Sequence, residues 1–223
     1  MKPIQIAIDG PAGAGKSTVA KRLAKKLDFC YIDTGAMYRA LTLKAIKKKH
    51  DLNSSGCIKQ LLSNTEIEIK NIRNEIHIFL DNKDVTYEIR QPEISNNVSN
   101  IAKIPEVRDH MLHLQREMAQ CGKVVMEGRD IGTVVLPEAD IKFFLTASLE
   151  ARANRRFLEL EKKGYSVDID SIAQEIAIRD KIDSKRQSAP LLKADDAIEV
   201  DTSNYDIDEA VDVLVQEIKK RLD

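Results

Sequence analysis

Apolar residues occur in short blocks along this chain, and helical patterns separate the blocks. Runs suited to buried strands lie at residues 4–8, 29–32, 124–126, 141–145 and 197–200. Stretches with apolar residues at helical spacing lie between them, such as the stretch that places Val19, Leu23 and Leu27 on one face. Five strands that alternate with helices predict an α/β fold with a parallel sheet covered on both faces.

The segment of about residues 63–90 departs from this alternation of strands and helices. Polar and apolar residues alternate in residues 66–70 and again in residues 75–78, and a turn-like segment, 71–74, joins the two runs. This pattern predicts an antiparallel hairpin with one face in water. We expect the hairpin to form a small lobe on the substrate side, inserted into the α/β chain.

Composition restricts the class of protein. Hydrophobic residues make up 43% of the chain and charged residues 32%, as in a folded protein. A length of 223 residues suits one core domain with an inserted piece. The formal net charge of −1 provides no global field for nucleic acid or an anionic membrane. No run approaches the ~18 apolar residues of a membrane span, and the first strand is too short for a signal-peptide core.

Cysteine usage gives no sign of an oxidising compartment. Cys30, Cys57 and Cys121 lie far apart and form no C-x-x-C motif, which predicts reduced thiols and neither a disulfide framework nor a zinc site. We therefore expect a cytoplasmic protein with no nucleic-acid or membrane partner.

A glycine-rich segment directly after the first strand matches G-x-x-x-x-G-K-[ST] in full and opens a helix. Its residues are Gly10, Pro11, Ala12, Gly13, Ala14, Gly15, Lys16 and Ser17. Backbone amides of such a loop cradle the β-phosphate of a nucleotide at the positive end of the helix. Lys16 would bridge the β- and γ-phosphates of ATP, Ser17 would ligate Mg²⁺, and Thr18 would complete the ATP site. A structural turn that binds nothing is the alternative. The loop indicates a nucleotide but no particular reaction.

Other classes of nucleotide-binding protein lack support in the sequence. A regulatory GTPase needs an N/T-K-x-D guanine motif, and residues 82–85 lack its final Asp; no D-x-x-G switch occurs either. A transporter ATPase needs an L-S-G-G-Q-like signature, which is absent. A nucleotide-dependent regulator without an acceptor site stays open as an alternative class, although it would need no second site for an anion.

Arginines are abundant near predicted turns and helix starts: Arg39, Arg108, Arg129, Arg179 and Arg186. Arg152, Arg155 and Arg156 lie at i, i+3 and i+4 and share one helix face. Each could be a solvated surface charge, but together with a phosphate loop they indicate a phosphate clamp. Phosphoryl transfer to an acceptor that is already anionic needs no general base, only positioning and charge neutralisation.

Three segments together resemble the bacterial-type cytidylate kinases, and the resemblance extends over about residues 4–200. They are Asp33-Thr34-Gly35-Ala36-Met37-Tyr38-Arg39, Gly128-Arg129-Asp130-Ile131-Gly132-Thr133, and the run Arg179-Asp180, Asp183, Arg186 and Ala189-Pro190-Leu191. Residues 150–156 are similar to the mobile lid of that family. The hairpin of about residues 63–90 resembles the segment that distinguishes these enzymes from the shorter eukaryotic UMP/CMP kinases.

The resemblance implies a single kinase domain, residues 1–223, with an adenylate-kinase-like P-loop core of five parallel strands. The core would comprise residues 1–35, 123–149 and 190–223, the lobe that binds the nucleoside monophosphate about 36–122, and the helical lid about 150–189. The implied activity is transfer of the γ-phosphoryl group of ATP to CMP or dCMP with Mg²⁺. Because lids must open and close, we expect a monomer.

The resemblance also implies site residues. ATP would contact residues 10–18 and the lid residues Arg152, Arg155 and Arg156. The catalytic residues would be Lys16, Arg129, Arg179 and Arg186. CMP would contact Thr34, Tyr38, Arg39, Ser99, Arg108, Arg129, Asp130, Arg179, Asp183 and Arg186.

The chemistry of cytosine supports part of this set independently. Cytosine presents an amine donor and two acceptors; a carboxylate accepts from the amine, and Arg or Ser donates to the acceptors. Asp130, Arg108 and Ser99 are such a set, and uracil would leave the carboxylate unpaired. UMP and a small alcohol such as shikimate remain alternative acceptors.

Several roles are left open by the sequence. Tyr38 fits the acceptor site or the core, and Glu127 fits either a place near Mg²⁺-bound water or a structural turn. Arg179 and Asp183, in a segment expected to begin after Ile178, could bind the acceptor sugar or form a surface ion pair. For the lid arginines, the only acidic partner expected at i+4 is Glu159, for Arg155.

Overall fold

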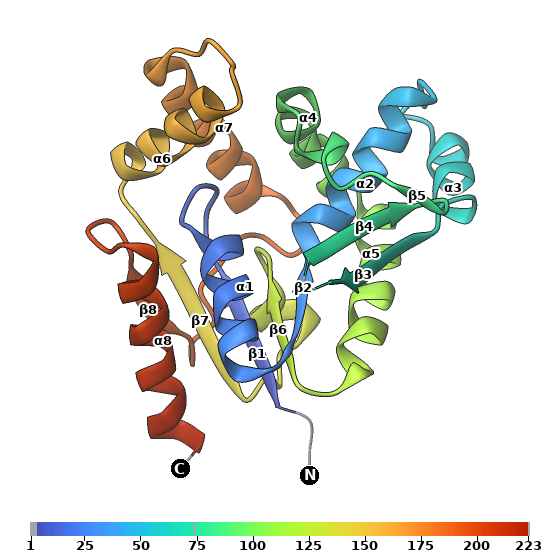
Figure 1. Ribbon diagram of the computed structural model, residues 1–223. Helices are drawn as coiled ribbons and strands as arrows, with labels where there is room; N and C mark the ends of the chain where they lie inside the picture. Colours follow the sequence, from blue (N-terminus) through green and yellow to red (C-terminus); the bar gives the residue numbers. More distant parts are fainter. Residues whose placement is uncertain (1–3, 74, 223) are drawn as a thin grey trace. The chain divides into compact units, whose positions relative to one another are not determined.

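The computed structural model of the chain describes residues 4–73 and 75–222. The chain divides into two compact units: unit 1 comprises Met1–Ile32 and Arg116–Asp223, and unit 2 comprises Asp33–Gln115. Figure 1 shows the elements of each unit in sequence colours.

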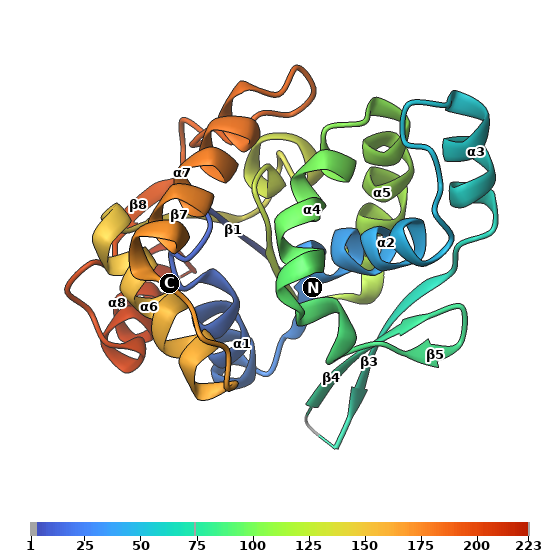
Figure 2. The same ribbon diagram turned by 90° about the horizontal axis from the view of Figure 1, so that it is seen from above.

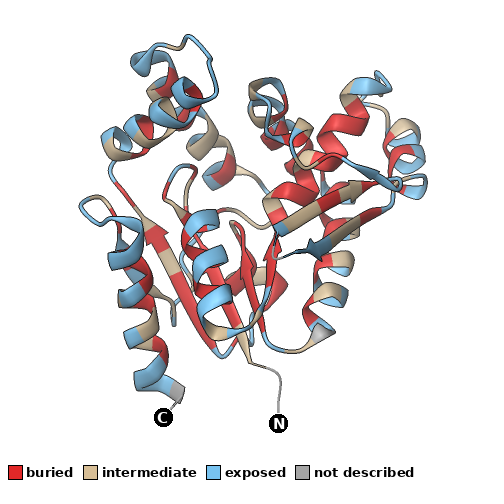
Figure 3. Cartoon of the chain, in the orientation of Figure 1, coloured by how far each residue is buried: buried red, intermediate tan, exposed pale blue. Residues whose placement is uncertain are grey.

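Unit 1 contains a five-stranded sheet in the order β2-β6-β1-β7-β8. Its strands are β1 (Gln5–Asp9), β2 (Cys30–Asp33), β6 (Val124–Glu127), β7 (Ile141–Thr146) and β8 (Ile198–Asp201). β1 pairs in parallel with both β6 and β7, and β7 pairs in parallel with β8. Every residue of β6 is buried, and most residues of β1 and β7 are buried as well (Figure 3). The predicted five-stranded parallel sheet is confirmed.

Strand register places the segments with the predicted site residues at the carboxyl ends of the parallel strands. Ile8 lies beside Glu127, and Asp9 lies beside Phe144. Because parallel strands end at the same edge, the segments that follow β1, β6 and β7 leave the sheet next to one another. The glycine-rich loop and the Gly128–Thr133 segment are two of these three.

Two helices pack on each other beside the sheet, α1 (Lys16–Leu27) and α8 (Ile207–Leu222). α1 buries an apolar stripe that includes Val19 and Leu23, as its helical spacing predicts. Asp28 is its C-cap: the residue has a left-handed backbone conformation, and its N–H donates to carbonyl oxygens of the last turn. Exposed ion pairs of Arg22 with Asp208 and Lys26 with Asp212 join the two helices.

A second helix pair, α6 (Leu149–Lys162) and α7 (Ile169–Lys185), has an apolar cluster of its own. Ala153 and Leu160 of α6 pack there against Ile172 and Ile176 of α7, with Phe157 beside them. Ser148 caps α6 and Asp168 caps α7 through side-chain oxygens. Unit 1 also contains a short 3₁₀ turn (Ala119–Cys121) and a π-helical turn (Ile131–Val135).

Unit 2 contains the predicted hairpin. β3 (Ile67–Ile72) pairs antiparallel with β4 (Glu75–Leu80), and a short strand that was not predicted, β5 (Lys83–Asp84), pairs with β4 (Figure 2). Asn74, in the predicted turn, lies outside the described residues. The helices are α2 (Thr34–Lys47), α3 (Ser55–Ser63), α4 (Pro92–Ala102) and α5 (Pro105–Met118), with a 3₁₀ turn (Glu88–Arg90) before α4.

Candidate active site

The glycine-rich loop needs glycine at the two positions where β1 ends and α1 begins. Gly10 has φ +146°, and a Cβ there would lie 1.9 Å from the carbonyl oxygen of Leu145. Gly15 has φ +85° and stands at the N-cap of α1. At Gly10 the close approach excludes any side chain, and at Gly15 the left-handed conformation strongly favours glycine. The backbone can therefore curl closely around a ligand before the amide groups at the start of α1.

Lys16 occupies the first turn of α1 and is buried at 5% exposure. Its Nζ donates a hydrogen bond to the carbonyl oxygen of Pro11 at 2.7 Å. Burial, with the charges of Arg129 and Arg179, lowers the pKa of Lys16 to about 7, although Glu127 and Asp9 oppose the change. The structure thus brings Lys16 into electrostatic reach of two of the predicted arginines.

Asp9, the last residue of β1, has a fully buried carboxylate. Its two oxygens accept the backbone N–H groups of Ile131 at 2.8 Å and Gly132 at 2.7 Å. Burial raises the pKa of Asp9 to about 6, the two backbone hydrogen bonds oppose this, and the charge of Asp130 adds to it. From the sequence, Asp9 was only the end of a strand; its spatial partners lie more than a hundred residues away.

Arg129 and Arg179 meet at the carboxylate of Asp183. Arg129 Nε donates to Asp183 Oδ2 at 2.9 Å, and Arg179 Nε lies 4.0 Å from the same oxygen. Burial alone would raise the pKa of Asp183, but Arg129 and Arg179 hold it below its ordinary value. The helix that carries Arg179 and Asp183 begins at Ile169, so a segment that begins after Ile178 was wrong. The surface-pair alternative is also wrong, because Asp183 is 3% exposed.

Arg186 and Asp130 form a second buried pair. Arg186 Nη2 lies 3.2 Å from Asp130 Oδ1, and the side chains are 4% and 7% exposed. Arg186 Nε also donates to the carbonyl oxygen of Ala189 at 2.7 Å. The predicted residues therefore form two ion-paired groups within unit 1: residues 129, 179 and 183, and residues 130 and 186.

The three lid arginines of α6 have different surroundings. Arg152 is buried and donates to the carbonyl oxygens of Ala147 and Ala12, and its Nη1 lies 2.5 Å from Asp180 Oδ2. Ala12 belongs to the glycine-rich loop, so this arginine already connects α6 to that loop. Arg156 is more exposed and pairs with Glu159 at 2.9 Å.

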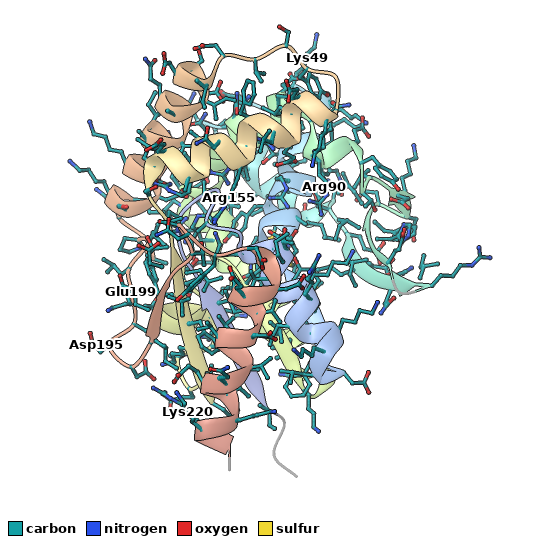
Figure 4. The ribbon with its side chains drawn as sticks, turned by 60° about the vertical axis from the view of Figure 1, so that its left-hand side comes forward. Lys49, Arg90, Arg155, Asp195, Glu199 and Lys220 are labelled. Carbon is teal, nitrogen blue, oxygen red and sulfur yellow. The ribbon has the colours of Figure 1, made fainter. Side chains whose placement is uncertain are left out.

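Arg155 reaches the segment after β8. Its guanidinium donates to Oγ1 of Thr202 at 3.1 Å and to the Thr202 carbonyl oxygen, and Figure 4 shows it on the side of α6 that faces the sheet. The expectation that Glu159 would pair with Arg155 was wrong: Glu159 pairs with Arg156 at i+3 and with Lys163 at i+4. Thr202, missed from the sequence, is buried, and its Oγ1 lies 3.2 Å from the Ala14 carbonyl oxygen of the loop.

Unit 2 carries the remaining predicted residues. Asp33 caps α2 by accepting the N–H of Ala36 at 2.7 Å, and it holds Arg39 Nη2 at 3.0 Å. Tyr38 is buried, with the guanidinium of Arg108 5.9 Å from its ring centre. Thr34 and Ser99 are also buried in this unit.

Glu127, like Tyr38, had two interpretations from the sequence: a place near Mg²⁺-bound water or a structural role in the turn. It is buried, and its Oε1 accepts a hydrogen bond from the hydroxyl of Tyr31 at 2.9 Å.

In residues 4–73 and 75–222, no three His, Cys, Asp or Glu side chains lie close enough together to form a metal cluster. No helix in these residues is long and apolar enough to span a membrane.

Comparison with known proteins gives one consistent result. Residues 6–220 match the family model described as cytidylate kinase. A cytidylate kinase of Geobacillus sp. (strain WCH70) is 51% identical, with 98% of each chain covered. One of Clostridioides difficile (strain 630) is 49% identical, covering 98% of this chain and 99% of its own.

A solved structure adds support at the level of the fold only. An uncharacterized protein from Eubacterium ventriosum ATCC 27560 aligns with a TM-score of 0.53 at 18% identity, over 99% of this chain and 100% of its own. The family itself rests on the sequence matches over nearly the whole chain. The chain belongs to the cytidylate kinase family.

Proposed function

We propose that the chain transfers the γ-phosphoryl group of ATP to CMP, and also to dCMP, forming CDP and dCDP. The observation that carries this proposal is the match of residues 6–220 to the cytidylate kinase family. Two buried arginine–aspartate pairs support it: Arg129 with Asp183, whose arginine acts on the charge of Lys16, and Arg186 with Asp130.

The donor nucleotide is assigned to the phosphate loop. Backbone amides of residues 10–18 would surround the β-phosphate, and Lys16 would leave the Pro11 carbonyl to contact the transferring phosphoryl group. Arg155 and Arg156 would add positive charge from α6, with Arg152 fixing α6 to the loop. Neutralisation of this kind lowers the barrier because charge is spread over the phosphoryl oxygens in the transition state.

Mg²⁺ fits the same loop. Ser17 is exposed at the start of α1, and its hydroxyl is the hard oxygen ligand that Mg²⁺ prefers. A single hydroxyl ligand from the protein is sufficient if the phosphate oxygens of ATP and water molecules supply the other ligands of Mg²⁺. When bound, Mg²⁺ would neutralise charge on the phosphate oxygens.

The acceptor nucleotide is assigned to the ten residues that the resemblance implies. From unit 1, Arg129, Arg179 and Arg186 would bind the CMP phosphate, Asp183 would accept from a ribose hydroxyl, and Asp130 would accept from the cytosine amine. From unit 2, the contributing residues would be Thr34, Tyr38, Arg39, Ser99 and Arg108. An anionic phosphate needs no base to remove a proton, so these residues would act by positioning and charge.

The proposal extends to the organisation of the chain. Residues 1–35, 123–149 and 190–223 would act as the core, about 36–122 as the lobe for the monophosphate, and about 150–189 as the lid. We propose a cytoplasmic monomer that acts on small nucleotides and has no nucleic-acid or membrane partner.

A substrate panel tests the assignment of the acceptor. ATP consumption should rise strongly with CMP and dCMP, and far less with UMP, AMP, GMP or shikimate. The contrast with UMP is the informative one, because cytosine offers an amine to Asp130 where uracil would present an acceptor. Coupled detection of ADP measures this directly. Asp208→Asn, which changes an exposed ion pair, is the control for activity lost during expression and purification. Equal rates with CMP and UMP would contradict the base assignment.

A further inference from the structure

Asp130 stands at the N-cap of the π-helical turn Ile131–Val135, but its side chain does not cap that turn. An aspartate at an N-cap ordinarily accepts a hydrogen bond from one of the first free N–H groups of its own helix. Here the N–H groups of Ile131 and Gly132 donate to Asp9 instead. A carboxylate from a different strand therefore caps this turn.

Because Asp9 caps this turn, the Asp130 carboxylate points instead toward Arg186, whose Nη2 lies 3.2 Å from Asp130 Oδ1. If Asp130 capped its own turn, its oxygens would be committed to the amides of the following residues. We propose that Asp9 is a positioning residue for substrate specificity: by capping the turn after Asp130, it keeps the Asp130 carboxylate available to Arg186 and to the base of the acceptor nucleotide. The reference to the base depends on the proposed function.

The surroundings of Asp9 favour a carboxylate at this position. Two oxygens accept from two amides, whereas an asparagine would turn an NH₂ group toward one of them. The nearby charged groups are Lys16 on α1 and Asp130 on the turn. Lys142 on β7 lies close as well: a Cβ on Gly132 would meet Lys142 Cδ at 3.1 Å and Asp9 Oδ2 at 3.4 Å, while the Lys142 ammonium pairs with Asp196.

The Asp9 side chain is buried, and burial disfavours its ionised form. A buried charge of this kind lowers stability unless hydrogen bonds compensate it. The hydrogen bonds from Ile131 and Gly132 offset part of this cost, and they hold the turn that follows Asp130, which is consistent with a role of Asp9 in placing Asp130.

The first test needs no substrate. In ¹⁵N-resolved NMR spectra of the free enzyme, the amide signals of Ile131 and Gly132 should shift together between pH 8 and pH 5, with a midpoint of about 6. In Asp9→Asn both signals should lose this titration. Persistence of the same titration in the variant would overturn the proposal, because another group would then be responsible.

The second test measures specificity. Asp9→Ala and Asp9→Asn should lower the preference for CMP over UMP, expressed as the ratio of the two kcat/KM values, by about tenfold for Ala and less for Asn. The ratio cancels effects on ATP binding, including any through Lys16. Asp140→Asn is the matched control, since Asp140 accepts the N–H of Gln5 at the start of the same strand; its ratio should stay unchanged. Equal losses with CMP and UMP in the Asp9 variants would overturn the proposal.

A double-mutant comparison separates this inference from the proposed function. Asp130→Asn should itself reduce the CMP preference, and Asp9→Asn added to it should reduce the preference no further. If Asp130→Asn keeps the preference, the base assignment fails and the specificity role of Asp9 fails with it, while the amide titration still decides the capping role. If Asp130→Asn abolishes the preference and both Asp9 variants retain it, only the role of Asp9 is overturned.

Discussion

Buried ion pairs distinguish the arginines proposed for the site from exposed arginines such as Arg22. Arg129 with Asp183 and Arg186 with Asp130 are largely removed from water, whereas Arg22 with Asp208 is exposed. An exposed pair contributes about 0–1 kcal/mol. Removing one partner of a buried pair is far more costly, about 3–5 kcal/mol, because a charge is left without compensation. Substitutions at these sites therefore need variants that preserve shape.

Asp183 offers the sharpest test at the residue scale. Replacement by Ala should lower kcat/KM by roughly 1–3 kcal/mol through loss of a buried hydrogen bond. The loss should differ between CMP and dCMP, because only CMP carries the 2′-hydroxyl that the carboxylate would accept from. Steady-state kinetics with both substrates measures this.

Two further variants interpret the result at Asp183. Asp183→Asn retains the volume of the side chain and limits the effect of an unpaired Arg129, and Asp208→Asn reports an exposed carboxylate in an ion pair. Equal activity of Asp183→Ala and wild type on both substrates, or equal losses on both, would remove Asp183 from the sugar site.

The α6–α7 pair behaves as a distinct element within unit 1. Its apolar cluster is internal to the two helices, and polar bonds of Arg152 and Arg155 connect α6 to the phosphate loop and to the segment after β8. Polar bonds can exchange partners when a nucleotide arrives, while the internal cluster keeps the two helices together. Because Arg152 already contacts the loop, closure should involve Arg155 and Arg156 more than Arg152.

Hydrogen exchange tests this movement. Amides of about residues 150–165 should exchange more slowly when a mimic that joins ATP and CMP is bound, because the lid arginines would then hold the phosphates. Mass spectrometry of peptides from α6 measures the change. Peptides from α8 are the internal control and should show little change. Unchanged exchange in α6 would contradict a lid.

For the molecule as a whole, the folded state has to accommodate the buried carboxylate of Asp9. Its pKa rises from 3.8 to about 6 on folding, so the native state binds more protons than the unfolded state in this pH range. The free energy of unfolding should therefore fall as pH rises from about 4 to about 6. About 2 pKa units correspond to about 3 kcal/mol. Asp183 has a lowered pKa and acts in the opposite direction below its ordinary pKa.

Urea unfolding at a series of pH values isolates the contribution of Asp9. The difference in unfolding free energy, Asp9→Asn minus wild type, should increase by about 3 kcal/mol between pH 4 and pH 7. Other groups cancel in this difference because both proteins share them. A constant difference across the range would show that Asp9 titrates with an ordinary pKa.

The sequence by itself predicted much of this molecule. Local spacing was sufficient for the strand, the glycine-rich loop and α1, because a loop that needs left-handed glycines between a strand and a helix has few alternatives. Alternation was sufficient for β3 and β4, which pair as an antiparallel hairpin and bury Ile67, Ile78 and Leu80, although Ile72 at the end of β3 is exposed. The family of the chain followed from motifs whose residues are adjacent in sequence.

Only the tertiary structure decided which charged groups meet. The i+4 spacing predicted an ion pair of Glu159 with Arg155. In the structure Glu159 pairs with Arg156, and Arg155 donates to Thr202. The fold also brings Asp9 to the amides of Ile131 and Gly132 through the pairing of β1 with β6. Spacing along a helix or strand limits near neighbours, whereas contacts across a sheet depend on strand order and register, which no local pattern records.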